Sequence, residues 1–195
     1  MIAIIDSGGA NIASVKFALE RLGADSALTK DPSVIKAADR VLLPGVGAAP
    51  IAMRRLQEAG LVDCIKSLTQ PVMGICLGMQ LLFAHSEEGN TPLLGIFEAA
   101  CKSFEPAEGR SVPHMGWNRL NFTAGHPLLV GIDDGAHVYF VHSYFAPETT
   151  ETVAACRYGV DFTAIVAQDN FMGCQFHPER SGPVGARILQ NFLEI

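Results

Sequence analysis

Short apolar runs in the first half of the chain alternate with stretches whose apolar residues recur at helical spacing. The apolar runs predict strands at residues 2–5, 41–43 and 72–75. The intervening stretches predict helices at residues 12–22, 49–59, 61–68 and 77–84. Strands that alternate with helices form parallel βαβ units. We therefore expect an α/β protein with a doubly wound, mostly parallel, flavodoxin-like central sheet and helices on both of its faces.

The second half of the chain has a different character, with many glycines and prolines and few helical patterns between residues 95 and 158. Short runs at residues 139–141 and 154–157 predict strands of a smaller antiparallel or mixed region. A last core strand is expected at residues 173–176, followed by a helix with Val184, Ile188 and Phe192 on one face. The sequence contains no repeat and no linker, so residues 1–195 are expected to form a single domain.

Charge and hydropathy exclude several classes of function. The formal net charge is −6 and no basic run occurs, which argues against a nucleic-acid partner. The first nine residues lack the basic flank and cleavage site of a signal peptide. Apolar stretches stay below the ~18 residues that a membrane-spanning helix needs. We expect a soluble, cytoplasmic protein without a membrane partner.

Five scattered cysteines argue against both a disulfide framework and a zinc site, because their number is odd and no C-x-x-C pair occurs. No metal ion or other cofactor is therefore expected. Four of them are interpreted as small buried apolar residues: Cys64, Cys101, Cys156 and Cys174.

The fifth, Cys76, lies in a G-x-C-x-G segment where a predicted strand meets a predicted helix. This is the nucleophile-elbow pattern with sulfur in place of oxygen. Gly74 and Gly78 would let the strand and the helix approach closely. The following helix would lower the pKa of the thiol, and the Leu77 amide would face a bound acyl oxygen. A core cysteine in a tight turn is the alternative reading of this segment.

A thiolate nucleophile needs a base, and the base needs a group that orients it. His177 and Glu179 are the best candidates, because alternate residues of an extended chain share a face and Pro178 keeps that chain extended. A surface His–Glu pair is the alternative. Among the other histidines, His85 is interpreted as solvated and following a helix, while His114 and His142 stay open.

A second turn, Pro44-Gly45-Val46-Gly47, also follows a predicted strand. Its glycines would allow a backbone N–H to face the site as a second oxyanion donor. Taken alone, the segment is also compatible with an ordinary turn between a strand and a helix.

Three segments in this order, PGVG, GICLGMQLLF and QFHPERSG, resemble the class I (triad) glutamine amidotransferases, and the resemblance covers the whole chain. Residues 6–15, 113–118 and 139–144 resemble the glutaminase subunits of imidazole glycerol phosphate synthases within that family. The first turn, Ser-Gly-Gly-Ala-Asn, departs from the Tyr-Gly-Met-Gly-Asn of many members, and Arg180 stands in place of a common lysine.

The resemblance implies the roles of the site residues. Cys76 would attack the glutamine carboxamide to form a glutamyl thioester, His177 would act as general base and acid, and Glu179 would orient His177. The backbone amides of Gly47 and Leu77 would form the oxyanion hole. The amino-acid end of the substrate would be bound by Gln80, Glu88 and the main chain near Ser143 and Tyr144. Without the resemblance, Glu88 would be interpreted as an exposed turn residue.

The resemblance also implies a partner, a (β/α)₈-barrel cyclase subunit that forms a heterodimer with the glutaminase. The cyclase would use the ammonia to convert PRFAR into imidazole glycerol phosphate and AICAR. The interface or signalling candidates are Asn11, His114, Trp117, Asn118, Tyr139, His142 and Arg180. A partly buried structural role is the alternative for Trp117, the single tryptophan.

Three other functions are alternatives for a chain with these motifs. A glutaminase that serves a different synthase is disfavoured by residues 113–118 and 139–144. A non-catalytic binding module would be expected to lack a triad residue. A γ-glutamyl cysteine hydrolase would need no partner. The glutaminase, in contrast, is expected to have low activity alone, because the Val46–Gly47 peptide would be misoriented until the cyclase and its ligand bind.

Overall fold

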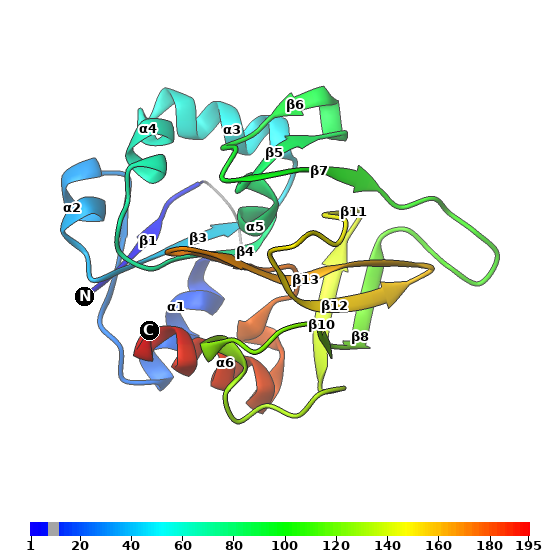
Figure 1. Ribbon diagram of the computed structural model, residues 1–195. Helices are drawn as coiled ribbons and strands as arrows, with labels where there is room; N and C mark the ends of the chain where they lie inside the picture. Colours follow the sequence, from blue (N-terminus) through cyan, green and yellow to red (C-terminus); the bar gives the residue numbers. More distant parts are fainter. Residues whose placement is uncertain (8–11) are drawn as a thin grey trace.

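The computed structural model describes residues 1–7 and 12–195, and its centre is an eight-stranded sheet (Figure 1). The first five strands in spatial order are parallel, and the last three continue the sheet in antiparallel fashion. The expected α/β class with a mostly parallel sheet is thereby confirmed. In spatial order the strands are β2 (Ser26–Thr29), β1 (Ile2–Ile5), β3 (Arg40–Gly45), β4 (Val72–Cys76), β14 (Phe171–Cys174), β13 (Val160–Gln168), β12 (Thr152–Tyr158) and β9 (Asn121–Phe122).

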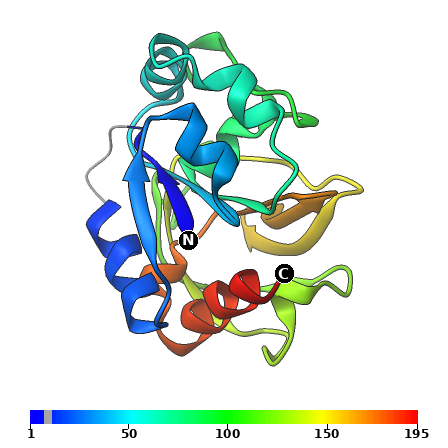
Figure 2. The same ribbon diagram turned by 90° about the vertical axis from the view of Figure 1, so that its left-hand side faces the viewer.

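Helices cover both faces of the parallel part, as Figures 1 and 2 show. Alternate residues of β1 explain the two layers. Ile2 and Ile4 pack into one apolar cluster with α1 (Ile12–Arg21) and α6 (Gly182–Glu194). Ala3 and Ile5 pack into a second cluster on the other face. The helices of that face are α2 (Pro32–Ala37), α3 (Ala49–Glu58), α4 (Leu61–Lys66) and α5 (Leu77–Leu81).

Two small sheets complete the described part of the chain. An antiparallel pair consists of β8 (His114–Arg119) and β10 (His137–His142). The other sheet has the order β11 (Tyr144–Phe145), β7 (Phe97–Ser103), β5 (Phe83–Ser86) and β6 (Thr91–Pro92). The 3₁₀ turns are η1 (Glu88–Asn90), η2 (Pro127–Leu129) and η3 (Pro178–Arg180). Within the described ranges, no helix has the length and apolar character needed to cross a membrane.

The helix expected at residues 77–84 is too long. Helix α5 ends at Leu81, and β5 begins at Phe83 because this residue pairs with β7. The centroid of the Phe83 ring lies 5.1 Å from that of Phe97 in the core. Phe97 lies outside the expected helix, so the pattern of residues 77–84 alone does not indicate this contact. His85 consequently lies half-buried on a strand, which corrects the interpretation of a solvated residue after a helix.

Two elements near the N-terminus were not predicted from the sequence. Strand β2 is an edge strand with no fully buried residue, so it lacks an apolar run. Helix α2 has only six residues, and the Asp31 side chain caps it by accepting a hydrogen bond from the Ser33 amide at 2.8 Å. At the other end of the chain, β14 (Phe171–Cys174) begins and ends two residues earlier than the core strand expected at 173–176.

Candidate active site

Cys76 is the last residue of β4, and α5 begins at the next residue. Its φ of 54° and ψ of −113° are a strained conformation for a residue with a side chain. Gly78 has room for no side chain, because a Cβ atom there would lie 1.7 Å from the Leu43 carbonyl oxygen. A Cβ on Gly74 would lie 2.6 Å from the Gly78 carbonyl group. The two glycines therefore allow the strand–turn–helix packing that exposes Cys76 to the site.

Three contacts surround the Cys76 thiol. Its Sγ lies 3.8 Å from the Val141 carbonyl oxygen, and the Gln175 side-chain amide donates to it at 3.8 Å. His177 also forms a side-chain hydrogen bond with Cys76. The Cys76 sulfur therefore lies against a carbonyl oxygen, a side-chain amide and the His177 ring.

His177 follows β14 and is held by its backbone. Its amide donates to the Tyr139 carbonyl oxygen at 2.9 Å, and its carbonyl oxygen accepts from the Ser181 hydroxyl at 2.7 Å. Its Nδ1 lies 2.8 Å from Oε1 of Glu179, and these side chains are only 5% and 0% exposed. The carboxylate fixes a proton on Nδ1, which leaves Nε2 as the ring nitrogen for Cys76.

The charge on His177 follows from its neighbours. Burial lowers the pKa of this histidine, but the hydrogen bonds and charges of Cys76 and Glu179 outweigh burial and raise the pKa to about 10. The imidazolium form of His177 is thus favoured at neutral pH beside the Cys76 sulfur. Such a pair is poised for attack by sulfur followed by proton donation to a leaving group.

A pocket of about 370 Å³ opens beside Cys76. All of the predicted oxyanion and substrate-binding residues line it together with two of the three predicted catalytic residues, whereas Glu179 lies behind His177. These lining residues are Gly47, Cys76, Leu77, Gln80, Glu88, Ser143, Tyr144 and His177. Gly47 has a φ of 95°, a conformation that residues with side chains rarely adopt.

The far end of the pocket holds an amide and a carboxylate. The Gln80 side-chain nitrogen donates to the Tyr144 carbonyl oxygen at 2.7 Å and to Gln175 Oε1 at 2.9 Å. Oε2 of Glu88 accepts from the Ala49 amide at 2.7 Å, at the start of α3. The carboxylate is therefore anchored and half-buried, which differs from a freely exposed turn residue.

Comparison with known proteins agrees with this geometry. The family model described as "Glutamine amidotransferase class-I" matches residues 3–195. The chain belongs to this family. The protein named imidazole glycerol phosphate synthase subunit HisH from Xanthomonas axonopodis pv. citri is 54% identical over 194 residues, which cover 100% of this chain and 97% of the relative. The protein of the same name from Xylella fastidiosa gives the same values.

Two solved structures share the fold of this class I glutamine amidotransferase. A structure titled glutamine amidotransferase has a TM-score of 0.75 at 22% identity and covers 99% of this chain and 97% of its own. The structure of PurLQS from Thermotoga maritima has a TM-score of 0.73 at 18% identity, with 99% and 97% covered.

Gln175 is a site residue of this amidotransferase that the sequence analysis missed. It is fully buried and connects Gln80 to the Cys76 thiol through its two amide atoms. The available signal was its position two residues before His177, since such residues share a face of an extended chain. A buried glutamine has no recognisable pattern of its own.

The interface candidates fall into three groups. Trp117 is 57% exposed on the β8–β10 sheet beside Tyr139, and Arg180 is also exposed. Asn118 is half-buried. The side chains of His114 and His142 are buried and bonded to each other, so the expectation that these histidines contact a partner directly is corrected. Their contact is internal. Asn11 lies outside the described residues.

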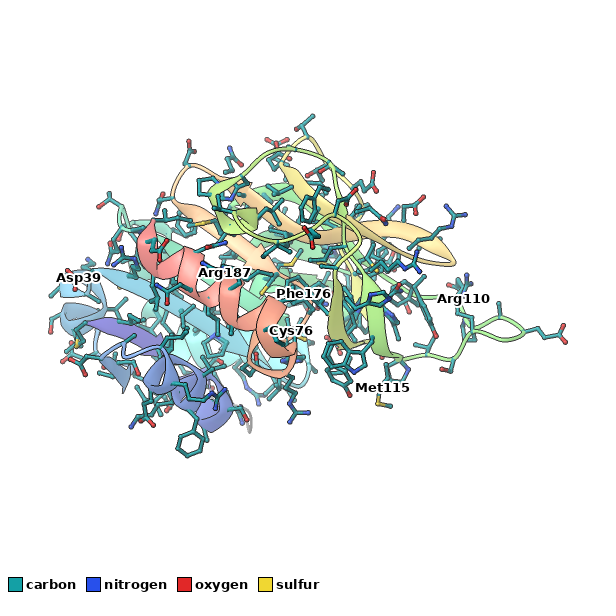
Figure 3. All side chains as sticks on the ribbon, turned by 90° about the horizontal axis from the view of Figure 1, so that it is seen from below. Asp39, Cys76, Arg110, Met115, Phe176 and Arg187 are labelled. Carbon is teal, nitrogen blue, oxygen red and sulfur yellow. The ribbon has the colours of Figure 1, made fainter. Side chains whose placement is uncertain are left out.

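The exposed face of the β8–β10 sheet carries Met115 and Trp117 together with the polar residues Arg119 and His137. Met115, 63% exposed, projects outward from β8, whereas Cys76 and Phe176 lie in the interior (Figure 3).

Elsewhere, the four remaining cysteines are buried as expected. Burial raises the pKa of Cys101 and Cys156 to about 12, which keeps these thiols protonated and unreactive. Among the described residues no cluster of three or more His, Cys, Asp or Glu could hold a metal ion.

Proposed function

We propose that this class I glutamine amidotransferase is the glutamine-hydrolysing subunit of an imidazole glycerol phosphate synthase in histidine biosynthesis. The carrying observation is the 54% identity over the full chain to relatives of that name. The pocket supports the proposal, because the Cys76 thiol, the His177 ring and the Glu88 carboxylate all line it.

In the proposed reaction, the Cys76 thiolate attacks the carboxamide carbon of glutamine. The carbonyl oxygen becomes an oxyanion, and the amides of Gly47 and Leu77 stabilise it. The imidazolium of His177 gives a proton to the amide nitrogen, so the C–N bond breaks and ammonia leaves. A water molecule, deprotonated by His177, then attacks the thioester and releases glutamate and the thiolate. Glu179 stabilises the imidazolium in each cycle.

The other end of glutamine would be bound at the far end of the pocket. The Glu88 carboxylate complements the α-ammonium group, and its contact with Ala49 holds it in place. Gln80 and the main chain near Ser143 and Tyr144 would complete the contacts to the amino-acid group. With its amino-acid group held in this way, glutamine would present its carboxamide to Cys76, which lines the same pocket.

The ammonia would pass to a (β/α)₈-barrel cyclase subunit, which converts PRFAR to imidazole glycerol phosphate and AICAR. The exposed face with Met115 and Trp117 supports this part of the proposal, since exposed aromatic residues are frequent anchors of protein interfaces. Tyr139 and Arg180 would lie at the edge of that contact. No cofactor takes part in the glutamine step.

The decisive experiment is Cys76→Ala in the chain assembled with the cyclase. Glutamine hydrolysis should fall by about 10⁴-fold or more, as for the loss of other nucleophiles, while turnover with free ammonia is kept. A loss of both activities contradicts the division of labour. Rapid glutamine hydrolysis by the wild-type chain alone, unaffected by the cyclase and PRFAR, would indicate a partner-independent hydrolase instead.

A further inference from the structure

A chain of hydrogen bonds connects strand β8 to the far end of the pocket. Asn118 Nδ2 lies 3.3 Å from His114 Nε2, and His114 Nδ1 lies 3.0 Å from His142 Nε2. His142 Nδ1 lies 2.7 Å from the Tyr144 carbonyl oxygen. That oxygen also accepts from the Gln80 side chain at 2.7 Å. The triad uses none of the atoms on these two histidines.

Each bond in this chain has one allowed direction. A carbonyl oxygen only accepts, so Nδ1 of His142 must carry the proton that it donates to Tyr144. In a neutral ring Nε2 is then the acceptor, and Nδ1 of His114 must donate to it. His114 Nε2 is consequently an acceptor as well. The two histidines thus share one tautomer, fixed from the pocket outward.

Asn118 closes the outer end of the chain in a single orientation. Its Nδ2 also donates to the Arg157 carbonyl oxygen at 3.0 Å, and its Oδ1 accepts from the Arg119 amide at 2.8 Å. A flipped amide would place a nitrogen against the Arg119 N–H and an oxygen against the Arg157 carbonyl. Both hydrogens of the amide nitrogen therefore have acceptors, one of which is His114.

Packing keeps the histidines neutral and in place. Both side chains are buried. The His114 ring is stacked on Tyr158 at 4.0 Å and on Phe140 at 4.9 Å between ring centroids. Burial lowers the pKa of His114 to about 4 and that of His142 to about 3, so neither is charged near neutral pH. A charged ring would turn one acceptor nitrogen into a donor and break the chain.

Gln80 is the point at which this chain meets the substrate pocket. The two hydrogens of its side-chain nitrogen are directed at the Tyr144 carbonyl oxygen and at Gln175 Oε1. Its own Oε1 is left as the atom that can accept from a ligand, and Gln80 lines the pocket. The position of the Tyr144 carbonyl group therefore determines where this acceptor stands.

We propose that His142 is a positioning residue that fixes the Tyr144 carbonyl group and, through it, the Gln80 amide that binds glutamine. His114 supports this role by holding His142 in the required tautomer. The inference rests on the proposed glutaminase function, because it names a residue that prepares the same pocket for its substrate. His142 touches neither end of the scissile bond and is not a catalytic residue in this scheme.

The test compares two reagents that alkylate Cys76 in the full chain, alone and assembled with the cyclase. The diazoketone 6-diazo-5-oxo-norleucine has the shape of glutamine and needs the far end of the pocket, whereas iodoacetamide does not. Labelling of the Cys76 peptide is followed by mass spectrometry, and the remaining cysteines are buried. The matched variants are His142→Leu and His142→Asn, which have nearly equal size, and only Asn keeps a donor near the Nδ1 position.

His142→Leu should lower the rate with the diazoketone by about tenfold, the effect of one lost buried hydrogen bond, and change the iodoacetamide rate by less than about twofold. His142→Asn should recover most of the diazoketone rate. An unchanged diazoketone rate in His142→Leu overturns the inference. So do equal losses with both reagents, which would indicate a general structural role, or an Asn variant no better than Leu.

A second variant keeps the test decisive if His142→Leu does not fold. His114→Phe retains the stacking on Tyr158 and Phe140 but removes the donor to His142, and should show the same selective loss to a smaller degree. Equal rates of wild type and His114→Phe would then overturn the inference. Failure of the proposed function looks different, because wild-type protein would itself neither hydrolyse glutamine with the cyclase nor react with the diazoketone.

Discussion

The charge of His177 depends on Cys76 and Glu179. The proton on His177 is favoured by the neighbouring sulfur and by Glu179, although burial opposes it. A mutation at Glu179 therefore affects sulfur chemistry without touching sulfur, and this separates the orienting role from the nucleophilic role.

Glu179→Gln tests the orienting role. Glutamine can still accept from Nδ1 of His177, but the loss of the negative charge lowers the pKa of the imidazolium and weakens the ion pair. We expect kcat for glutamine hydrolysis in the assembled complex to fall by about 10²- to 10⁴-fold with a small change in KM. Steady-state kinetics would check this, with the exposed-site variant Glu148→Gln as control. Wild-type kcat in Glu179→Gln would contradict the role.

The sequence predicted the residues of this site unevenly, for a physical reason. The catalytic triad lies in segments whose backbone conformation requires particular residues, and these residues are visible in the sequence. They are the glycines that flank Cys76 and the proline between His177 and Glu179. Gln175 and the pair of His114 with His142 leave no such pattern. Their roles arise only when segments distant in sequence are brought into contact, as in the 28-residue separation of the two histidines.

At the scale of elements, the turn between β4 and α5 is determined by backbone contact. The Gly78 backbone packs directly against the end of β3, with no space for a Cβ atom beside Leu43. The neighbouring strands β3 and β14 both pair with β4, so the turn cannot move without disturbing the centre of the sheet. The turn that carries Cys76 is thus also important for the packing of the parallel sheet.

Gly78→Ala should therefore be strongly destabilising. The added methyl group would lie 1.7 Å from a main-chain oxygen, and relief requires α5 to move away from β3. We expect a loss of unfolding free energy of about 3 kcal/mol or more, measured by urea denaturation. Gly125→Ala is the matched control, because a Cβ atom there meets nothing within 4 Å. Equal stability of the two variants would contradict the packing argument.

Two of the strands that the sequence failed to predict depend on distant partners. Strand β5 forms next to a helix because Phe83 pairs with β7, and β2 forms at an exposed edge because β1 offers hydrogen bonds to it. The strands predicted correctly are buried on both faces and read as apolar runs. Local pattern thus predicted the centre of the sheet, while its edges depend on pairing.

At the scale of the whole molecule, the pocket lies where β3, β4 and β14 end and where β10 crosses beside them. The parallel strands bring Gly47, Cys76 and His177 to their carboxyl ends, the usual site of ligands in such sheets. The β8–β10 pair supplies Val141 and His142 to the same pocket. A small accessory sheet thereby contributes both a wall of the pocket and an exposed surface.

The buried histidines should make the fold sensitive to acid. Unfolded histidines bind protons near pH 6.5, whereas burial lowers the pKa of His114 to about 4 and of His142 to about 3. Between these values the unfolded state binds more protons, so stability falls as the pH falls. At pH 5 the loss is about 2 kcal/mol for each histidine relative to pH 7.

Urea denaturation at pH 7 and pH 5 would measure this effect in the wild type and in the double variant His114→Phe, His142→Leu. The double variant should lose less free energy between the two pH values, by about 2 kcal/mol for each histidine. The raised pKa of His177 works in the opposite direction, but both proteins contain it and its contribution cancels. Identical losses in the two proteins would contradict the assignment of neutral buried histidines.

The exposed face of the β8–β10 sheet should carry the contact with the cyclase. Trp117→Ala would remove a large aromatic side chain that is 57% exposed and therefore adds little to the stability of the isolated chain. We expect the Kd for the cyclase, measured by calorimetry, to rise about 30-fold, or about 2 kcal/mol, as for a central aromatic anchor. Phe17→Ala is the matched control, because Phe17 is equally exposed but lies on α1. Saturating cyclase should restore glutamine hydrolysis in Trp117→Ala, since the residue does not line the pocket. An unchanged Kd, or an equal rise for Phe17→Ala, would place the interface elsewhere.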